Sequence, residues 1–240
     1  MAYADITVRD PNPIKRWLQR RRFRDALAIL YDADSTKSLK ILDFGGGDGE
    51  LFFQLLQRHP NVCVCLYEPN LSLLNEAKGK LSAWEDVYFT SDIGSVDKES
   101  FDYVYCLEVF EHLPLEPTRQ AISLIYESLK PGGFAIVGVP HELFAPALLK
   151  GLFRMSRRYG EFDARFSTIA RAAIGRPPQD RPVAEIFQGF SYYFHHLGFD
   201  YRQLERCLIE RFELVSKWFS PARILGPLLN SEVYFLLRKT

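Results

Sequence analysis

The first 140 residues alternate between short apolar runs and segments whose apolar residues repeat at helical spacing. The runs predict strands and the periodic segments predict helices. Strands are expected at 40–45, 62–68, 86–92, 101–109 and 134–140, and helices at 50–59, 71–81 and 119–129. Near-continuous apolar strands joined by helices indicate a parallel sheet that is covered on both faces.

The pattern changes after Pro140. About 60 residues with basic, aromatic and proline-rich pieces precede the next clear strand, and we interpret 141–200 as an insertion. A helix is then expected at 201–211, with strands at 212–219 and 232–239. The linker between these two strands is too short for a crossover helix, so we expect them to be antiparallel. The predicted fold class is therefore α/β, with a Rossmann-like doubly wound sheet, a helical lid insertion and one antiparallel C-terminal strand.

Composition and charge narrow the class of protein. The 240 residues suit one large α/β domain with an insertion, and 30 basic side chains balance 30 acidic ones, so no global charge favours nucleic acid. Charges interrupt every apolar run before the roughly 18 residues of a membrane span. These features predict a cytoplasmic protein, with peripheral membrane contact as the alternative. None of the four cysteines has zinc or redox spacing, and we predict no metal.

The stretch ILDFGGGDGE, residues 41–50, predicts a buried strand that breaks into a tight turn before a helix. No lysine follows Gly49, which excludes a nucleoside-triphosphate loop, and Glu50 stands where a dinucleotide fingerprint needs glycine. Acidic side chains at Asp48 and Glu50 would also repel a pyrophosphate from the helix start. The turn is thus expected to meet a cationic or zwitterionic ligand.

Several motifs, in order, resemble class I S-adenosylmethionine-dependent methyltransferases of the small-molecule type (methyltransferase type 11/12-like). They are the acid-glycine turn at 43–49, LYEPN at 66–70, the D-I pair at 92–93, CLEVFEHL at 106–113 and LKPGGFAIVGVP at 129–140. The resemblance covers about 39–140 and, more loosely, the C-terminal strands. It implies a seven-stranded sheet and S-adenosylmethionine as the cofactor.

The resemblance also implies the residues that bind this cofactor. The glycine turn approaches the methionine part, the acid ending the second strand holds the ribose, the D-I pair meets the adenine, and the end of the fourth strand lies beside the transferable methyl group. The set implied is Asp43, Phe44, Gly45, Gly46, Gly47, Glu68, Pro69, Asp92, Ile93, Cys106 and Leu107.

Two histidines are candidate catalytic residues. An acceptor oxygen or protonated nitrogen must lose a proton, and an imidazole suits that task near neutral pH. His112 follows the fourth strand, where the family segment lies beside the methyl group. His196, in SYYFHHLGF, precedes the last core helix, where family members can place a histidine toward the substrate. The alternatives are a packing or cofactor-side position for His112 and a solvent-facing or helix-capping role for His196.

Two basic, helix-periodic segments flank the core. Residues 141–162, read as a helix, place one apolar and one basic face on opposite sides. Either this lid packs its apolar stripe on the core, or it contacts a membrane surface or an anionic, lipid-linked acceptor. The expected apolar stripe is Leu148, Leu152, Met155 and Tyr159, and the basic face is Lys150, Arg154, Arg157 and Arg158. In the segment 14–30, the stripe of Ile14, Trp17, Leu18, Arg21 and Leu30 could cover the cofactor site.

The predicted organisation is an N-terminal helical cap at 1–38, an S-adenosylmethionine-binding core at 39–140, a lid and substrate insertion at 141–200, and a C-terminal helix with the last two strands at 201–240. The expected activity is methylation, mainly at oxygen, of a small-molecule or lipid-linked acceptor. A nucleic-acid methyltransferase and a non-catalytic nucleotide-binding or regulatory protein are the alternatives; the chain lacks the N-P-P-aromatic motif of the former. Neither the acceptor nor the oligomeric state follows from the sequence.

Overall fold

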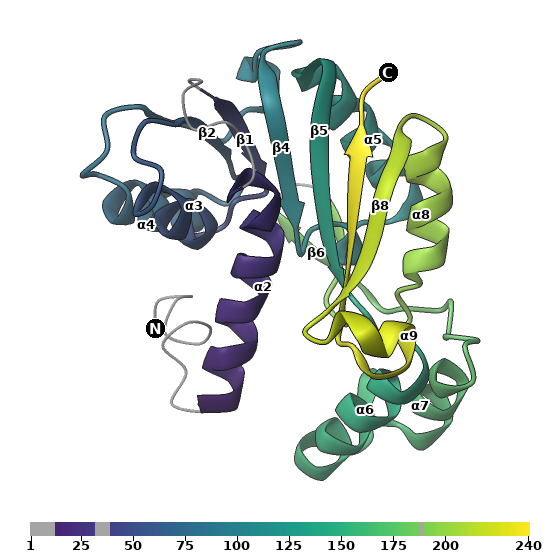
Figure 1. Ribbon diagram of the computed structural model, residues 1–240. Helices are drawn as coiled ribbons and strands as arrows, with labels where there is room; N and C mark the ends of the chain where they lie inside the picture. Colours follow the sequence, from purple (N-terminus) through teal and green to yellow (C-terminus); the bar gives the residue numbers. More distant parts are fainter. Residues whose placement is uncertain (1–12, 32–38, 188–189) are drawn as a thin grey trace.

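The computed structural model describes residues 13–31, 39–187 and 190–240, and Figure 1 shows their arrangement. Seven strands form one sheet in the order β3-β2-β1-β4-β5-β9-β8. All neighbouring pairs are parallel except those made by β9, which is antiparallel to both β5 and β8. The strands are β1 (Lys40–Phe44), β2 (Cys63–Tyr67), β3 (Val87–Thr90), β4 (Phe101–Leu107), β5 (Leu129–Pro140), β8 (Glu213–Ser220) and β9 (Glu232–Arg238). The expected fold class is confirmed.

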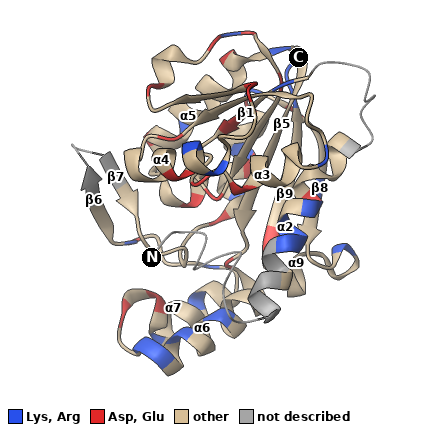
Figure 2. Ribbon diagram, turned by 90° about the vertical axis from the view of Figure 1, so that its left-hand side faces the viewer, with Lys and Arg blue, Asp and Glu red and all other residues tan. Residues whose placement is uncertain are grey.

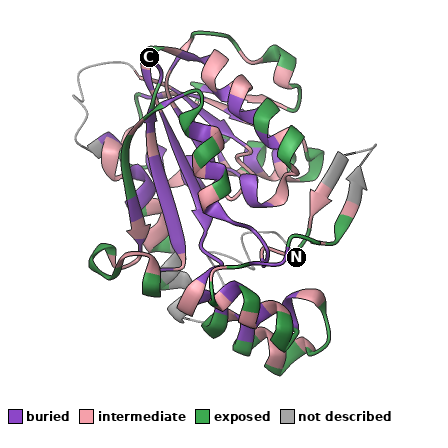
Figure 3. Ribbon diagram, turned by 90° about the vertical axis from the view of Figure 1, so that its right-hand side faces the viewer, coloured by how far each residue is buried: buried purple, intermediate pink, exposed green. Residues whose placement is uncertain are grey.

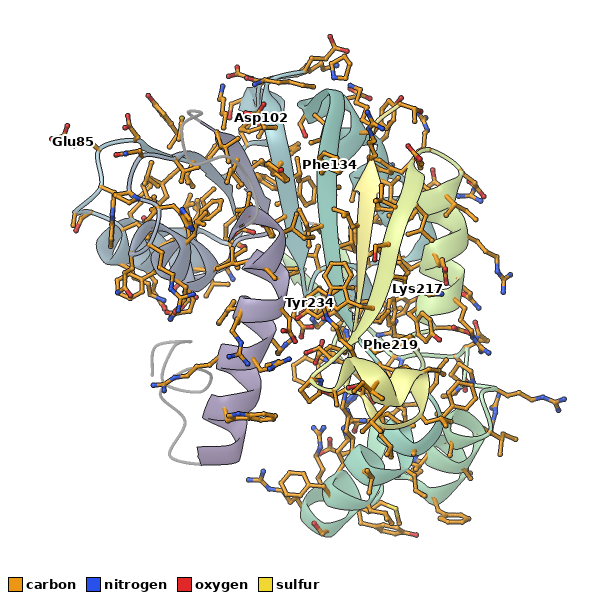
Figure 4. All side chains as sticks on the ribbon, in the orientation of Figure 1. Glu85, Asp102, Phe134, Lys217, Phe219 and Tyr234 are labelled. Atoms are coloured by element: carbon orange, nitrogen blue, oxygen red, sulfur yellow. The ribbon has the colours of Figure 1, made fainter. Side chains whose placement is uncertain are left out.

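Helices cover both faces of the sheet because alternate strand residues point to opposite sides. Ile41 packs with α2, α3 and α4, whereas the next residue, Leu42, packs with α5 and α8. Each face therefore has its own apolar core, and the central strands of the sheet are largely buried, whereas half of the residues in the edge strand β8 are exposed (Figure 3). The helices are α2 (Pro13–Tyr31), α3 (Glu50–Leu56), α4 (Leu71–Lys80), α5 (Leu115–Ser128) and α8 (Tyr201–Ile209).

The parallel register brings the carboxyl ends of the first four strands to one edge. Phe44 of β1 is opposite Tyr67 of β2, and Tyr67 is opposite Thr90 of β3. Asp43 is opposite Tyr105 of β4 on the other side. The loops after these strands therefore meet at a single edge, which is where open α/β sheets bind ligands.

The insertion between β5 and α8 combines helices with a strand pair. It contains α6 (Phe144–Arg158), a short turn η3 (Phe162–Ala164), α7 (Phe166–Ala173), β6 (Val183–Phe187) and β7 (Phe190–Tyr193). Helices α6 and α7 lie beyond the end of the sheet at which β4 terminates (Figure 1). The antiparallel β6–β7 pair was not expected from the sequence, which predicted no strand in this segment.

Helix α6 turns a different face inward from the one expected if the lid packed its apolar stripe on the core. Its buried side consists of small residues, Pro146, Ala147 and Gly151, and a Cβ at Gly151 would lie only 2.6 Å from Ile169 of α7. The predicted apolar stripe does not pack on the core, because Leu148, Leu152 and Tyr159 are exposed and only Met155 is partly buried. Figure 2 marks in blue the positions of the basic residues along the same helix.

Two of the basic residues expected to face solvent instead anchor the lid. Glu142, which is 1% exposed, pairs with Lys150 Nζ at 3.0 Å and accepts two hydrogen bonds from Arg154 at 2.9 and 3.0 Å. Burial alone would raise the pKa of Glu142, but the two cations lower it to about 2. The need to neutralise this buried carboxylate fixes which face of α6 turns inward.

Two element boundaries differ from the prediction. The helix expected at 119–129 begins at Leu115, and the strand expected at 134–140 begins at Leu129, so the PGG segment lies inside β5 instead of closing a helix. In α2, Leu30 is buried and Trp17 is exposed, while the side chains of Ile14 and Leu18 lie outside the described residues. Among the described helices, none has the length and apolar content needed to cross a bilayer.

Candidate functional site

The turn after β1 is built on glycines in the left-handed region. Gly45 and Gly47 have φ values of 78° and 56°, which side-chain-bearing residues rarely adopt. The amides of Gly45 and Gly46 both donate to the carbonyl of Tyr67, which fixes the turn to the end of β2. A Cβ at Gly45 would lie 2.5 Å from Val109, whereas one at Gly47 would meet nothing within 4 Å. The backbone at Gly47 thus faces open space.

Asp43 is a buried acid without a counter-ion beneath this turn. It is 2% exposed, and its Oδ2 makes no hydrogen bond within the described part of the chain. Burial, together with repulsion from Glu68 and Asp48, raises the pKa of Asp43 to about 8. A buried carboxylate of this kind is costly unless a cation or donor reaches it. Its position fits a ligand that carries positive charge or hydrogen-bond donors.

The other two acids of the turn do not face a ligand. Lys80 of α4 lies 2.6 Å from Asp48 Oδ2 and 2.8 Å from Glu50 Oε2. Both carboxylates are therefore neutralised within the protein. The expectation that Asp48 and Glu50 would repel a pyrophosphate loses its physical basis, and the acidic character of the turn comes from Asp43 and Glu68.

Glu68, at the end of β2, is tied to the turn by its own carboxylate. Oε2 accepts from the Gly47 amide at 2.9 Å and Oε1 accepts from the Asn70 amide at 2.8 Å. Burial raises the pKa of Glu68, and these two hydrogen bonds oppose the shift. Since a carboxylate offers about four acceptor positions, two remain for donors such as a pair of ribose hydroxyls. Pro69, half-buried, follows directly.

The remaining cofactor candidates lie along the same edge. Asp92 is exposed and caps the short turn η1 (Ile93–Ser95) by accepting from the Gly94 amide at 2.9 Å, while Ile93 packs on the core. Phe44 is buried against the ring of Tyr67. Cys106 is buried in β4, and burial raises the pKa of its thiol. Leu107 packs against Gly138 of β5.

The end of β4 also carries a charged network that the sequence analysis missed. Glu108, with a φ of 58°, pairs with Arg22 of α2, and Arg22 also lies 3.3 Å from Glu232 of β9. Burial alone would raise the pKa of Glu108, but Arg22 lowers it to about 2; burial and Glu108 raise the pKa of Glu232 to about 8. The partners are 86 or more positions apart, so no spacing rule could have found them.

The two candidate histidines lie together, as neither motif alone could show. His112 of η2 (Phe110–His112) and His196 have ring centroids 4.8 Å apart, and His112 stacks on Tyr192 of β7 at 4.4 Å. Burial lowers the pKa of His112 and lowers that of His196 to about 4. Both imidazoles are therefore neutral at pH 7. The β6–β7 arm thus brings the insertion to the end of β4.

Comparison with known proteins agrees with this geometry. Residues 42–135 match a family model described as a methyltransferase domain, and the match spans the strands that carry the glycine turn, Glu68 and the start of β5. Residues 42–135 thus resemble a methyltransferase domain. The match supports the predicted family and enzyme class, and the sheet order is the one expected for that fold.

Solved structures of methyltransferases share the fold. The N-methyltransferase NodS from Bradyrhizobium japonicum WM9, in complex with S-adenosyl-L-homocysteine, has a TM-score of 0.57 at 16% identity, over 96% of this chain and 89% of NodS. Magnesium protoporphyrin IX methyltransferase from Synechocystis PCC 6803, with the same product bound, has a TM-score of 0.57 at 17% identity, over 95% and 88%. The 1,6-didemethyltoxoflavin-N1-methyltransferase from Burkholderia thailandensis, with its namesake substrate and S-adenosylhomocysteine, has a TM-score of 0.56 at 18% identity, over 95% and 82%.

The protein should become more stable when Asp43 is replaced by asparagine. The folded-state pKa of Asp43, about 8, lies above its ordinary value of 3.8, so the wild-type protein loses stability as the pH rises from about 4 to 8. Asp43→Asn removes this loss, and its advantage should grow over that interval, reaching at least about 1 kcal/mol at pH 8. Urea unfolding of both proteins at pH 5, 7 and 8 measures the difference. A constant or negative difference would contradict the assignment of a buried, unpaired acid.

Proposed function

We propose that this protein transfers the methyl group of S-adenosylmethionine to an oxygen of a small, amphiphilic acceptor. The observation that carries the proposal is the edge formed by the ends of β1, β2 and β4. Asp43, Glu68 and the open backbone at Gly47 lie on its donor side. The histidine pair lies on its acceptor side, next to the end of β4.

S-adenosylmethionine is the cofactor predicted from the sequence, and NodS and the protoporphyrin enzyme were solved with its demethylated product. The donor side fits this molecule. Asp43 Oδ2, which has no partner among the described residues, can accept a hydrogen bond from the methionine part. The two open acceptor positions on Glu68 can accept hydrogen bonds from the ribose hydroxyls. The cofactor supplies a methyl group on a positively charged sulfur. The protein aligns an acceptor with that methyl, and positioning of this kind supplies about 7–11 kcal/mol of a barrier.

The acceptor side favours a group that must lose a proton. The carbonyl of Tyr193 lies 2.8 Å from His112 Nδ1, and a carbonyl can only accept, so Nδ1 carries the proton. The lone pair of the neutral ring is then on Nε2. This arrangement favours an acceptor hydroxyl over an unprotonated amine, which needs no such group. Small organic molecules are the substrates in the toxoflavin and protoporphyrin enzymes, which supports this class over nucleic acid.

The surface beside this edge supports an amphiphilic or lipid-linked acceptor. On α6, Leu149 and Phe153 are 61% and 57% exposed in addition to the stripe described above. Helix α9 (Gly226–Leu229) contacts α6 and exposes Leu228 and Leu229, next to η4 (Arg223–Leu225), in which Ile224 is 99% exposed. Arg157 lies over the Phe153 ring and Arg223 over the Trp218 ring. Apolar residues with basic neighbours are typical of surfaces that bind anionic membranes.

Calorimetry with S-adenosylhomocysteine tests the donor side. Glu68→Gln removes the charge that we expect the ribose hydroxyls to use, so the Kd should rise at least tenfold, since a charged hydrogen bond contributes about 1.5–3 kcal/mol. Glu50→Gln is the matched control, because in that variant Lys80 still pairs with Asp48. Equal affinities in wild-type and Glu68→Gln proteins would remove Glu68 from the cofactor site.

Incubation of metabolite extracts with a methyl-labelled donor identifies the acceptor, and turnover on that compound tests the histidine. His112→Ala should reduce turnover by about 10²–10⁴ while the S-adenosylhomocysteine Kd changes only a few-fold, because His112 acts on the acceptor side. His195→Ala is the control, since its ring faces Asp163 at 3.4 Å. Unchanged turnover in His112→Ala would exclude the proposed role, and label on an amine or nucleic acid would exclude a hydroxyl acceptor.

Flotation with vesicles tests the exposed apolar surface. The protein should float with vesicles in which about one third of the lipid is anionic, and much less with neutral vesicles. Both the apolar area and the basic charge of this surface contribute to membrane binding. Leu152→Asp should abolish flotation, whereas Ile209→Asp on α8, a residue that is also about half exposed (52%), should not. Equal flotation of the two variants would count against this surface as the membrane contact.

A further inference from the structure

Glu111, in η2, is buried without a partner. The residue is 0% exposed, and neither of its carboxylate oxygens makes a hydrogen bond within the described residues. Native proteins seldom leave both oxygens of a buried carboxylate unsatisfied, because desolvation of the group is costly. Arg181 donates a hydrogen bond to the Glu111 backbone carbonyl at 2.6 Å, a contact that does not involve the carboxylate. Within the described residues, the two carboxylate oxygens are thus left for a donor or cation from outside this set.

The two candidate histidines present nitrogen to the same place. His112 Nε2 lies 3.7 Å from Glu111 Oε1, and its orientation is set by the hydrogen bond of Nδ1 to the Tyr193 carbonyl. A backbone carbonyl on one imidazole nitrogen, with the other nitrogen left as a lone-pair donor, is the usual arrangement of a metal-binding histidine. The stacked ring of Tyr192 holds the same orientation.

The spacing of the three side chains fits a single ion. One ligand atom from each of Glu111, His112 and His196 can be chosen so that all lie within 4.8 Å of one another. Ligand atoms around a cation with bonds of about 2.0–2.2 Å are separated by roughly 3–4 Å. An inward movement of less than about 1 Å would therefore close the set around an ion.

The charge of the surroundings also favours a cation. Glu111 and Glu232 are buried and Glu108 is partly buried, and Arg22 pairs with Glu108 and Glu232. Lys150 faces Glu142 and two carbonyls, and Arg181 faces two carbonyls and the Tyr193 ring. These contacts are directed to groups other than the Glu111 carboxylate, which the charges of Arg22 and Arg181 also attract.

We propose that Glu111, His112 and His196 bind one divalent first-row transition-metal ion. Two imidazoles and one carboxylate suit Zn²⁺, Mn²⁺, Fe²⁺ or Co²⁺, whereas Mg²⁺ and Ca²⁺ prefer oxygen ligands alone. Three protein ligands leave coordination positions open for water or for an oxygen of the acceptor. In the proposed function, on which this role rests, the ion would orient the acceptor hydroxyl and lower its pKa, so that with the ion bound His112 assists loss of the proton as a metal ligand and not as a free base. Metal binding itself does not depend on that function.

The test is titration of the chelator-treated full-length protein with Zn²⁺, Mn²⁺ and Mg²⁺, followed by calorimetry and by the shift in Tm. One Zn²⁺ or Mn²⁺ per chain should bind, with Mg²⁺ at least about a hundredfold weaker. Glu111→Gln, which conserves shape, and His196→Asn should each weaken Zn²⁺ binding at least about a hundredfold, because each removes one of three ligands. His195→Asn, a change at the neighbouring histidine, should leave the affinity unchanged.

A second measurement on the wild-type protein does not depend on the folding of variants. Bound Mn²⁺ should broaden the imidazole NMR signals of His112 and His196 and leave that of His59 sharp. No saturable binding, equal binding by wild-type and Glu111→Gln proteins, or uniform broadening of all histidines would overturn the site. S-adenosylhomocysteine is titrated into the same metal-free samples. Retained cofactor binding without metal binding refutes only the metal site, whereas loss of cofactor binding refutes the proposed function.

Discussion

Parallel pairing of β1 with β2 and β4 places carboxylates in the interior, at the end of the sheet. The register sets Asp43 beside Glu68 through the turn, and it sets Glu108 and Glu111 just beyond the end of the neighbouring strand. Most of these side chains are deprived of water, Glu108 being only partly buried, and several lack a cation of their own among the described residues. Burying these acids opposes folding, because each must either be ionised without water or hold a proton, as the raised pKa of Asp43 indicates, and the two apolar cores on either face of the sheet must offset that cost. The same property makes the edge receptive to positively charged ligands.

The remainder of the chain is arranged around this charge. Helix α2 supplies Arg22 to Glu108 and Glu232, α4 supplies Lys80 to the glycine turn, and α6 supplies Lys150 and Arg154 to Glu142. In the first two cases a long basic side chain reaches a carboxylate that is 30 or more positions away in sequence, and in the third the separation is 8 and 12 positions. The insertion, through α6, and the N-terminal helix α2 are thereby held to the core by ion pairs as much as by apolar packing. This explains how α6 can leave large apolar residues exposed and remain attached to the core.

Properties written in local sequence were predictable. The apolar runs predicted the parallel strands, the short final linker predicted the antiparallel β9, and the glycine spacing predicted the turn, in which Gly45, Gly47 and Gly49 are all left-handed. Contacts between distant segments were not. Lys80 is 30 positions from Glu50, so the acids of the turn looked unpaired. The face of α6 was assigned from its apolar residues alone, because nothing near it in sequence shows that Glu142 is buried. The grouping of Glu111 and His112 with His196 was likewise not predictable, since His196 is 84 positions from His112 and joins them only through the fold.

The two sides of the edge differ in how they are built, and this bears on specificity. The donor side comes from consecutive strand ends within 43–93 and is held by backbone hydrogen bonds, such as those from Gly47 and Asn70 to Glu68. The acceptor side combines η2 with β7, α2 and β9, all of which lie outside residues 43–93. Substitutions in the insertion can therefore reshape the acceptor side while the backbone that would hold the cofactor stays intact. The histidine pair joins the core to the insertion, because His112 belongs to the core and His196 to the insertion. If the proposed function holds, acceptor choice and activation would be coupled through the position of the β6–β7 arm, which stacks Tyr192 on His112.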